Sequence, residues 1–143
     1  MAADRNRTTL QQFYTAFNQH DIEAIAPCIA DDIAVPHGEP LGLGHGREAY
    51  LKFVSLWFEA FPDMHTEVLQ MVAEDKLVAI RLRNTGTHEG EFMGIPATGR
   101  RFDLEVGHFS RHNDDGEIIE ELPYFDQLAF LQQLGVIPED ALA

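Results

Sequence analysis

The chain has a single cysteine, Cys28, so no disulfide can form within it. We therefore expect a protein of a reducing compartment, the cytoplasm. No apolar run approaches the ~20 residues of a membrane span, and the N-terminus lacks the apolar core of a signal peptide. Basic residues are also scarce: 10 Lys and Arg stand against 24 Asp and Glu, a formal net charge of -14. Such a surface repels phosphates and anionic lipid heads, so neither nucleic acid nor membranes are expected partners.

Motifs for nucleotide or metal chemistry are missing as well. The sequence has no Walker loop, no dinucleotide fingerprint and no His-Glu-x-x-His, and its histidines and carboxylates lack metal-ligand spacing. We predict no metal and no cofactor. No repeat, low-complexity tract or linker interrupts the 143 residues, which predicts one domain over 1–143.

Helical patterns fill the first part of the chain. Apolar residues at helical spacing predict a first helix that ends near Asn18, with a possible capping box at Thr9. Asp21 is typical of the N-cap of a short second helix, which Pro27 should bend or break. The strongest apolar stripe lies in 47–61 and predicts a third helix, terminated by the proline that follows.

The period then changes to that of strands. Alternating stretches predict strands at 33–35, 66–73, Leu77–Thr87, Arg101–His112 and 117–122. Tight turns at 74–76 and 113–116 join neighbouring strands, and Asp126 opens a last short helix through Leu134. We predict an α+β fold, with helices packed on one face of an antiparallel meander.

Several segments, in this order along the chain, are shared with one known family. They are Phe17-Asn18-Gln19-His20-Asp21, Ala60-Phe61-Pro62-Asp63-Met64-His65, Gly86-Thr87-His88-Glu89-Gly90, Gly94-Ile95-Pro96-Ala97-Thr98-Gly99-Arg100, Tyr124-Phe125-Asp126 and Gln133-Leu134-Gly135. Through them the chain resembles the SnoaL-like polyketide cyclases, a branch of the nuclear-transport-factor-2-like folds. The resemblance implies a cone-shaped, curved, antiparallel or mixed sheet, packed by N-terminal helices around a pocket.

The resemblance also implies a function. Cyclases of this family close a ring in polycyclic aromatic polyketide esters by intramolecular aldol condensation, without a cofactor. Two alternatives stay open: a non-catalytic protein of the same fold that binds a small hydrophobic molecule, and a cofactor-independent hydroxylase or isomerase. Self-association as a homodimer or tetramer, through the outer face of the sheet, is a further expectation.

Asp126 and His108 are the predicted catalytic residues. The resemblance matches Asp126 to the family's acid/base and His108 to the residue facing it across the cavity. A carboxylate among aromatic side chains is a better base, and an imidazole can donate to a carbonyl. The alternatives are a plain helix N-cap for Asp126 and a core histidine for His108.

Five further side chains are predicted to contact the substrate: Phe17, Phe53, Trp57, His88 and Tyr124. Aromatic walls suit a planar ligand, whereas the alternative is that these rings simply fill the core. For His88 the alternative is a turn residue bonded to the backbone.

Three other positions bear on the shape of the site. Arg81 and Arg83 alternate with apolar residues, and we expect them to face solvent or a partner, because two buried unpaired guanidinium groups would be very costly. Many relatives carry Trp where this chain has Leu122, which implies a pocket of different shape.

Overall fold

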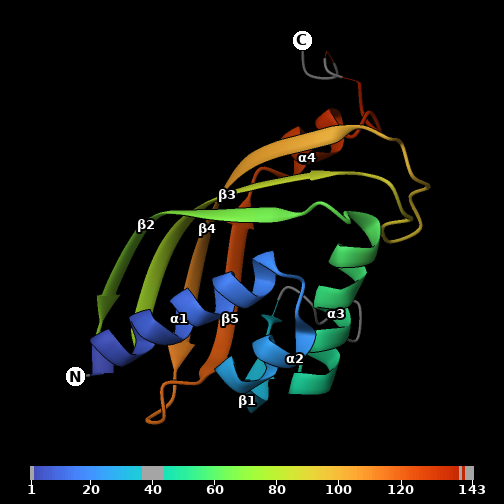
Figure 1. The fold of residues 1–143 in the computed structure, drawn as a ribbon. Helices are drawn as coiled ribbons and strands as arrows, with labels where there is room; N and C mark the ends of the chain where they lie inside the picture. The colour runs from blue at the N-terminus through green and yellow to red at the C-terminus, as the bar shows by residue number, and fades with distance from the viewer. Residues whose placement is uncertain (1, 37–43, 139, 141–143) are drawn as a thin grey trace.

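The computed structural model describes residues 2–36, 44–138 and 140. Its elements are α1 (Ala2–Asn18), α2 (Ile22–Ile25), the 3₁₀ turn η1 (Ala26–Cys28), β1 (Ile29–Ala34), α3 (Arg47–Ala60), β2 (His65–Glu74), β3 (Leu77–Thr87), β4 (Arg101–His112), β5 (Ile118–Phe125) and α4 (Gln127–Gln133). Figure 1 shows a strongly bent sheet with α1 in front of it and α3 to its right. The predicted α+β class is confirmed.

The sheet is mixed rather than a simple meander. Its strands lie in the order β1-β5-β4-β3-β2; β1 runs parallel to β5 and every other neighbouring pair is antiparallel. β1 begins four residues before the predicted 33–35. Exposed Asp31 and Asp32 sit between its buried residues, so the strand shows no regular alternation. The sequence pattern therefore concealed most of this strand.

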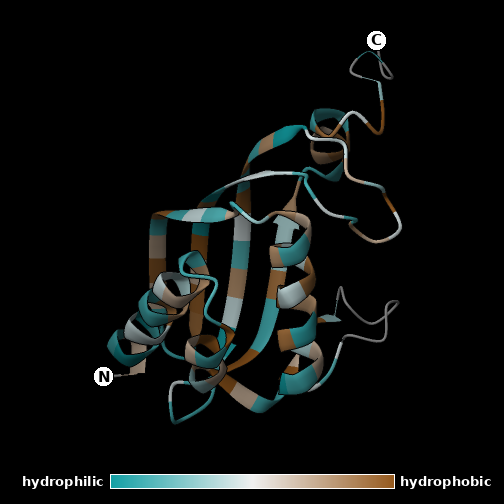
Figure 2. Ribbon diagram, turned by 45° about the vertical axis from the view of Figure 1, so that its right-hand side comes forward, coloured by the Kyte–Doolittle hydropathy of each residue, from teal (hydrophilic) through white to brown (hydrophobic). Residues whose placement is uncertain are grey.

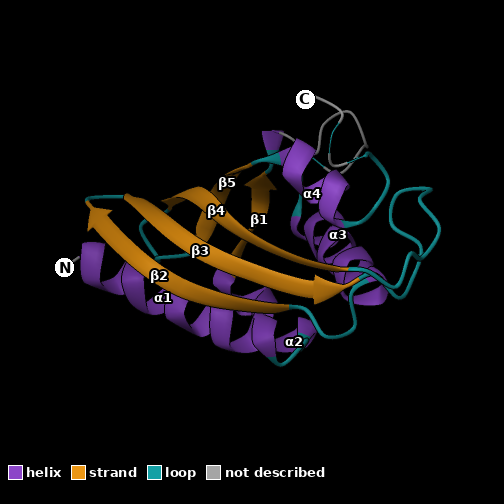
Figure 3. Cartoon of the chain, turned by 90° about the horizontal axis from the view of Figure 1, so that it is seen from above, coloured by secondary structure: helices purple, strands orange, loops and turns teal. Residues whose placement is uncertain are grey.

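A bulge contributes to the bend of the sheet. The register between β2 and β3 shifts between Val68 and Gln70. An extra residue of this kind bends the strand and increases its twist. Seen from above, α1 and α2 follow the same side of the curved strands (Figure 3). The curvature provides the concave surface that the helices cover.

Most helix boundaries follow the predictions. α1 ends at Asn18, and the Asp21 carboxylate caps α2 by accepting a hydrogen bond from the Ala24 amide at 3.1 Å. The chain changes to a 3₁₀ turn around Pro27, as expected. The proposed capping box is wrong, because Thr9 lies inside α1 and donates its hydroxyl to the Arg5 carbonyl at 3.2 Å.

Hydrophobic and hydrophilic residues alternate along the strands (Figure 2). One buried cluster joins α1, β1 and the middle of the sheet through residues such as Leu10 and Ile80. A second cluster joins the end of α3 and α4 to the first residues of β4 through Phe61, Phe102 and Phe130. No helix in the described part of the chain is long and apolar enough to cross a membrane.

The outer face of the sheet carries ion pairs. Arg81 bonds Glu105 at 2.6 Å, and the Arg83 Nε bonds Asp103 at 2.8 Å. All four residues belong to β3 and β4, and both arginines are exposed. The expectation that the arginines face away from the cavity is confirmed.

Candidate active site

A cavity of about 530 Å³ lies between the inner face of the sheet and helices α1, α3 and α4. Phe17, Phe53 and Trp57 line it, as the hypothesis of an aromatic wall requires. The loop after β3 adds Phe92, whose ring centroid lies 4.5 Å from that of Trp57. An apolar cavity with aromatic walls suits a flat, hydrophobic ligand.

Four polar side chains from four different elements meet in this cavity. They are Tyr14 of α1, Tyr50 of α3, His108 of β4 and Glu121 of β5. The Tyr14 hydroxyl lies 3.3 Å from His108 Nδ1, and Glu121 Oε1 lies 3.7 Å from the same nitrogen. Both tyrosines and Glu121 are at most 6% exposed. The cluster is therefore a buried polar centre in a mostly apolar wall.

Glu121 supplies the carboxylate of this cluster. Its Oε1 has no hydrogen-bond partner among the described residues. A buried charged oxygen without a donor is costly, so a ligand that offers a proton there would gain free energy. This atom is an acceptor that the cavity offers to a ligand.

The two tyrosines are hydrogen-bond donors. Burial, and then the charge of Glu121, raise the pKa of Tyr14 well above its ordinary value. The same two causes raise the pKa of Tyr50, together with a side-chain hydrogen bond to Glu121. Both hydroxyls therefore keep their protons at neutral pH.

Asp126 does not line the cavity, so the prediction that it faces His108 from a dry position is wrong. Its side chain is exposed, and its Oδ1 accepts a hydrogen bond from the Ala129 amide at 2.9 Å. β5 continues to Phe125, three residues past the predicted end, and Asp126 then caps α4. The first four backbone amides of a helix lack a partner within the helix, and the Asp126 carboxylate accepts a hydrogen bond from one of them at the start of α4.

His88 is not a cavity residue either. It is fully buried behind the wall, where its ring stacks on Phe61 with centroids 5.3 Å apart. Its Nδ1 lies 3.0 Å from the Thr98 hydroxyl. Burial lowers the pKa of this imidazole. These contacts agree with the alternative given for His88, a turn residue. His88 holds the loop 88–100 in place through Thr98.

Tyr124 borders the cavity, but its ring lies on the other side of β5. Tyr124 pairs with Gly107 and packs edge to face on Phe109, with centroids 6.1 Å apart. Because strand side chains alternate, Phe125 points inward and Tyr124 outward. Leu122 pairs with Phe109 on the same outer side, so the expected effect of this residue on the pocket is wrong.

The alternation of side chains along the strands indicates that Glu121 shares a face with His108. The resemblance pointed to Asp126 instead. In the sheet Pro123 lies opposite His108, and Glu121 lies opposite Ser110. The predicted turn at 113–116 would also have placed residue 121 on the face of His108, because side chains alternate along both strands. Strand parity could thus have identified the carboxylate that accompanies the imidazole.

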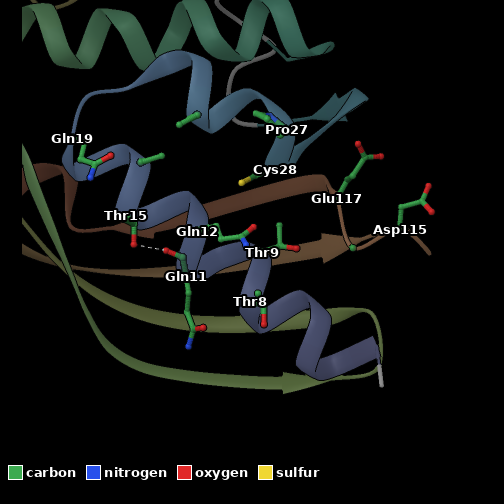
Figure 4. Close-up of a pocket in the computed structure, with 13 residues that line it drawn as sticks. Thr8, Thr9, Gln11, Gln12, Thr15, Gln19, Pro27, Cys28, Asp115 and Glu117 are labelled. Carbon is green, nitrogen blue, oxygen red and sulfur yellow. Dashed lines mark hydrogen bonds between the residues drawn. The ribbon is translucent and has the colours of Figure 1, made fainter.

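A second hollow lies outside this cavity, between α1, η1 and the turn before β5. Figure 4 shows that threonine and glutamine side chains of α1 border this groove of about 650 Å³. One of them, Thr15, donates its hydroxyl to the Gln11 carbonyl at 2.9 Å. The groove is open and has no paired acid and base. Nowhere in the described residues do three His, Cys, Asp or Glu side chains group as metal ligands.

Comparison with known proteins identifies the family to which the chain belongs. The family model described as SnoaL-like polyketide cyclase matches residues 8–134. The chain is 33% identical to the aklanonic acid methyl ester cyclase DnrD of Streptomyces peucetius, over 75% of this chain and 77% of that protein. It is 30% identical to the cyclase of the same name, DauD, of Streptomyces sp. (strain C5), over 88% of this chain and 79% of that protein.

Solved structures support the fold. IdmH of Streptomyces antibioticus superposes with a TM-score of 0.74 at 35% identity, covering 91% of this chain and 98% of that one. The predicted resemblance, in both fold and cyclase-like function, is confirmed.

Proposed function

Because the chain belongs to the SnoaL-like polyketide cyclase family, we propose that it closes a ring in a planar aromatic polyketide ester by a cofactor-independent aldol reaction. The reaction is an isomerisation, so it needs an acid and a base but no electron carrier. We propose aklanonic acid methyl ester, the substrate in the relatives' names, as the first compound to assay.

Glu121 is the base in this proposal. Its Oε1 removes a proton from the carbon beside one carbonyl and leaves an enolate. The enolate carbon then attacks a second carbonyl of the same molecule and forms the new carbon–carbon bond. The resulting alkoxide takes back the proton that Glu121 holds, so every atom of the substrate is retained in the product.

His108 is the donor. An N–H aimed at a carbonyl oxygen stabilises the negative charge that develops there, and such donors act strongly in a site without water. One observation carries the assignment: a buried carboxylate oxygen, with no hydrogen-bond partner in the described part of the chain, lies 3.7 Å from an imidazole inside an aromatic cavity.

Replacing Glu121 by Gln tests the proposal. We expect turnover to fall at least about 100-fold, since general bases contribute ~10²–10⁴-fold. Glu120→Gln is the matched control, because Glu120 is the neighbouring residue of β5 and pairs with Arg111 in the exposed sheet register. Equal activity of the two variants contradicts the role of Glu121. Tight binding of the ester to the wild type without any product would support a binding protein instead.

We further propose a homodimer formed through the outer face of the sheet. Val72, Ala79, Phe109 and Leu122 form one row across four strands by register. Val72 is 56% exposed and Phe109 is 43% exposed. A row of exposed apolar side chains beside ion pairs is typical of a surface that another copy covers.

The dimer proposal has its own test. Phe109→Glu places a charge at the centre of this row, and we expect light scattering after size exclusion to report a monomer. Glu105→Gln, at the ion pair beside the row, is the control that should leave the dimer intact, since exposed pairs contribute only ~0–1 kcal/mol. A wild-type protein that is monomeric at about 100 μM would rule the interface out.

A further inference from the structure

His108 Nδ1 lies between two groups of opposite hydrogen-bonding character. The Tyr14 hydroxyl is 3.3 Å away, and the Glu121 carboxylate oxygen is 3.7 Å away. Only the first distance is within hydrogen-bonding range. A neutral imidazole has one donor and one acceptor nitrogen, so the partner of Nδ1 decides what Nε2 offers to a ligand.

Tyr14 keeps a proton that it can donate to this nitrogen. It is 6% exposed, and the unfavourable burial of its anion keeps the phenol protonated. Its O–H is therefore available to donate to Nδ1 across the 3.3 Å contact, and an Nδ1 that accepts leaves the ring proton on Nε2. Nε2 makes no hydrogen bond to any described residue, and His108 is one of the residues that line the cavity.

From this geometry we infer that Tyr14 is a positioning residue, which holds the His108 ring as the tautomer that carries its proton on Nε2. The ring then presents a donor to the ligand, while Glu121 presents an acceptor. The consequence for turnover rests on the proposed function; the tautomer itself does not.

This arrangement separates the two chemical roles. If Nδ1 carried the proton instead, the Nδ1–H would donate to the Glu121 carboxylate. Nε2 would then face the cavity as an acceptor, in addition to Glu121. An enolate oxygen would then meet no donor from the pair. Removing the Tyr14 hydroxyl should favour that arrangement, because among the described residues the Glu121 carboxylate then remains as the polar group near Nδ1.

Tautomers can be read directly from ¹⁵N shifts in long-range ¹H–¹⁵N spectra of histidine-labelled protein. The spectra are recorded near pH 8.5, about two units above the ordinary imidazole pKa of ~6.5. A His108→Gln variant assigns the signal among the seven histidines. We expect the Nε2–H form in the wild type and a shift to the Nδ1–H form in Tyr14→Phe. Tyr50→Phe is the matched control. This variant removes a hydroxyl that bonds Glu121 and not His108, so the tautomer of His108 should stay unchanged.

A wild-type spectrum of the Nδ1–H form, or an unchanged spectrum in Tyr14→Phe, overturns the inference. Turnover provides the second readout: kcat of Tyr14→Phe should fall about tenfold with little change in KM, as for the loss of one hydrogen bond made at the transition state. If the wild type turns over no ester at all, the proposed function fails while the spectra still decide the tautomer.

Discussion

Replacing Asp126 by Ala would separate helix capping from catalysis. The variant loses the 2.9 Å hydrogen bond from the Ala129 amide to the Asp126 carboxylate. Loss of such a cap destabilises a protein by about 1 kcal/mol. Because α4 and its C-cap bury Phe130 and Leu134 against the second core cluster, the whole domain should share this loss.

The expected size of the effect can be stated as a temperature. An unfolding entropy of ~2.1 cal/mol/K per residue gives about 0.3 kcal/mol/K for a chain of this length, so Tm should fall by about 3 °C. Circular dichroism measures this shift. Turnover of the ester, assayed well below Tm, should stay within about twofold of the wild type, because the carboxylate does not line the cavity.

Asp126→Asn is the control, since asparagine is as good a cap as aspartate. This variant should match the wild type in both Tm and turnover. If its turnover instead fell by about 100-fold at an unchanged Tm, Asp126 would be the base and the assignment of Glu121 would be refuted.

Three further predictions concern other parts of the fold. Gly90→Ala should lower the free energy of unfolding by at least about 2 kcal/mol in urea titrations, because a Cβ there would collide with the Glu59 backbone carbonyl; a neutral result would contradict this close approach of the loop to α3. Burial lowers the pKa of His112, so the folded state binds fewer protons than the unfolded state, and stability should fall as the pH drops below about 6.5. His112→Gln should therefore reduce the change in the free energy of unfolding between pH 5 and 8, while buried His88 should retain part of that change. An unchanged slope of the free energy against pH would contradict the role of His112. Trp57→Ala should weaken binding of the ester about tenfold by calorimetry, whereas Trp57→Phe keeps an aromatic wall and should bind nearly normally.

Local patterns were enough for the strands and helices that alternate or repeat cleanly. The bounds of β3 and β4 match the predicted ranges, and α3 ends one residue before the predicted 61. β1 was mostly missed, because Asp31 and Asp32 interrupt its apolar pattern, and its stability comes from pairing with β5. A pairing partner almost 90 residues away leaves no periodic trace in either strand.

The proposed catalytic pair, His108 and Glu121, shows the same limit more sharply. His108 was singled out because the resemblance matches it to the family residue that faces the acid/base across the cavity, whereas its place on an apolar strand face by itself favoured a core histidine. Glu121 was overlooked and Asp126 preferred, although both are acidic residues near the end of β5. What distinguishes them is where the chain leaves the sheet, since β5 continues through Phe125 and only then turns into α4.

The amino-acid sequence by itself determined the α+β class, the family and the aromatic character of the cavity wall, because these depend on composition, periodicity and ordered segments. Only the tertiary structure decided which carboxylate is dry, which ring nitrogen faces Tyr14 and which aromatic rings face outward. Those properties depend on strand register and on contacts between α1, α3, β4 and β5. Burial and hydrogen bonding are created when distant segments meet, and no single segment contains them.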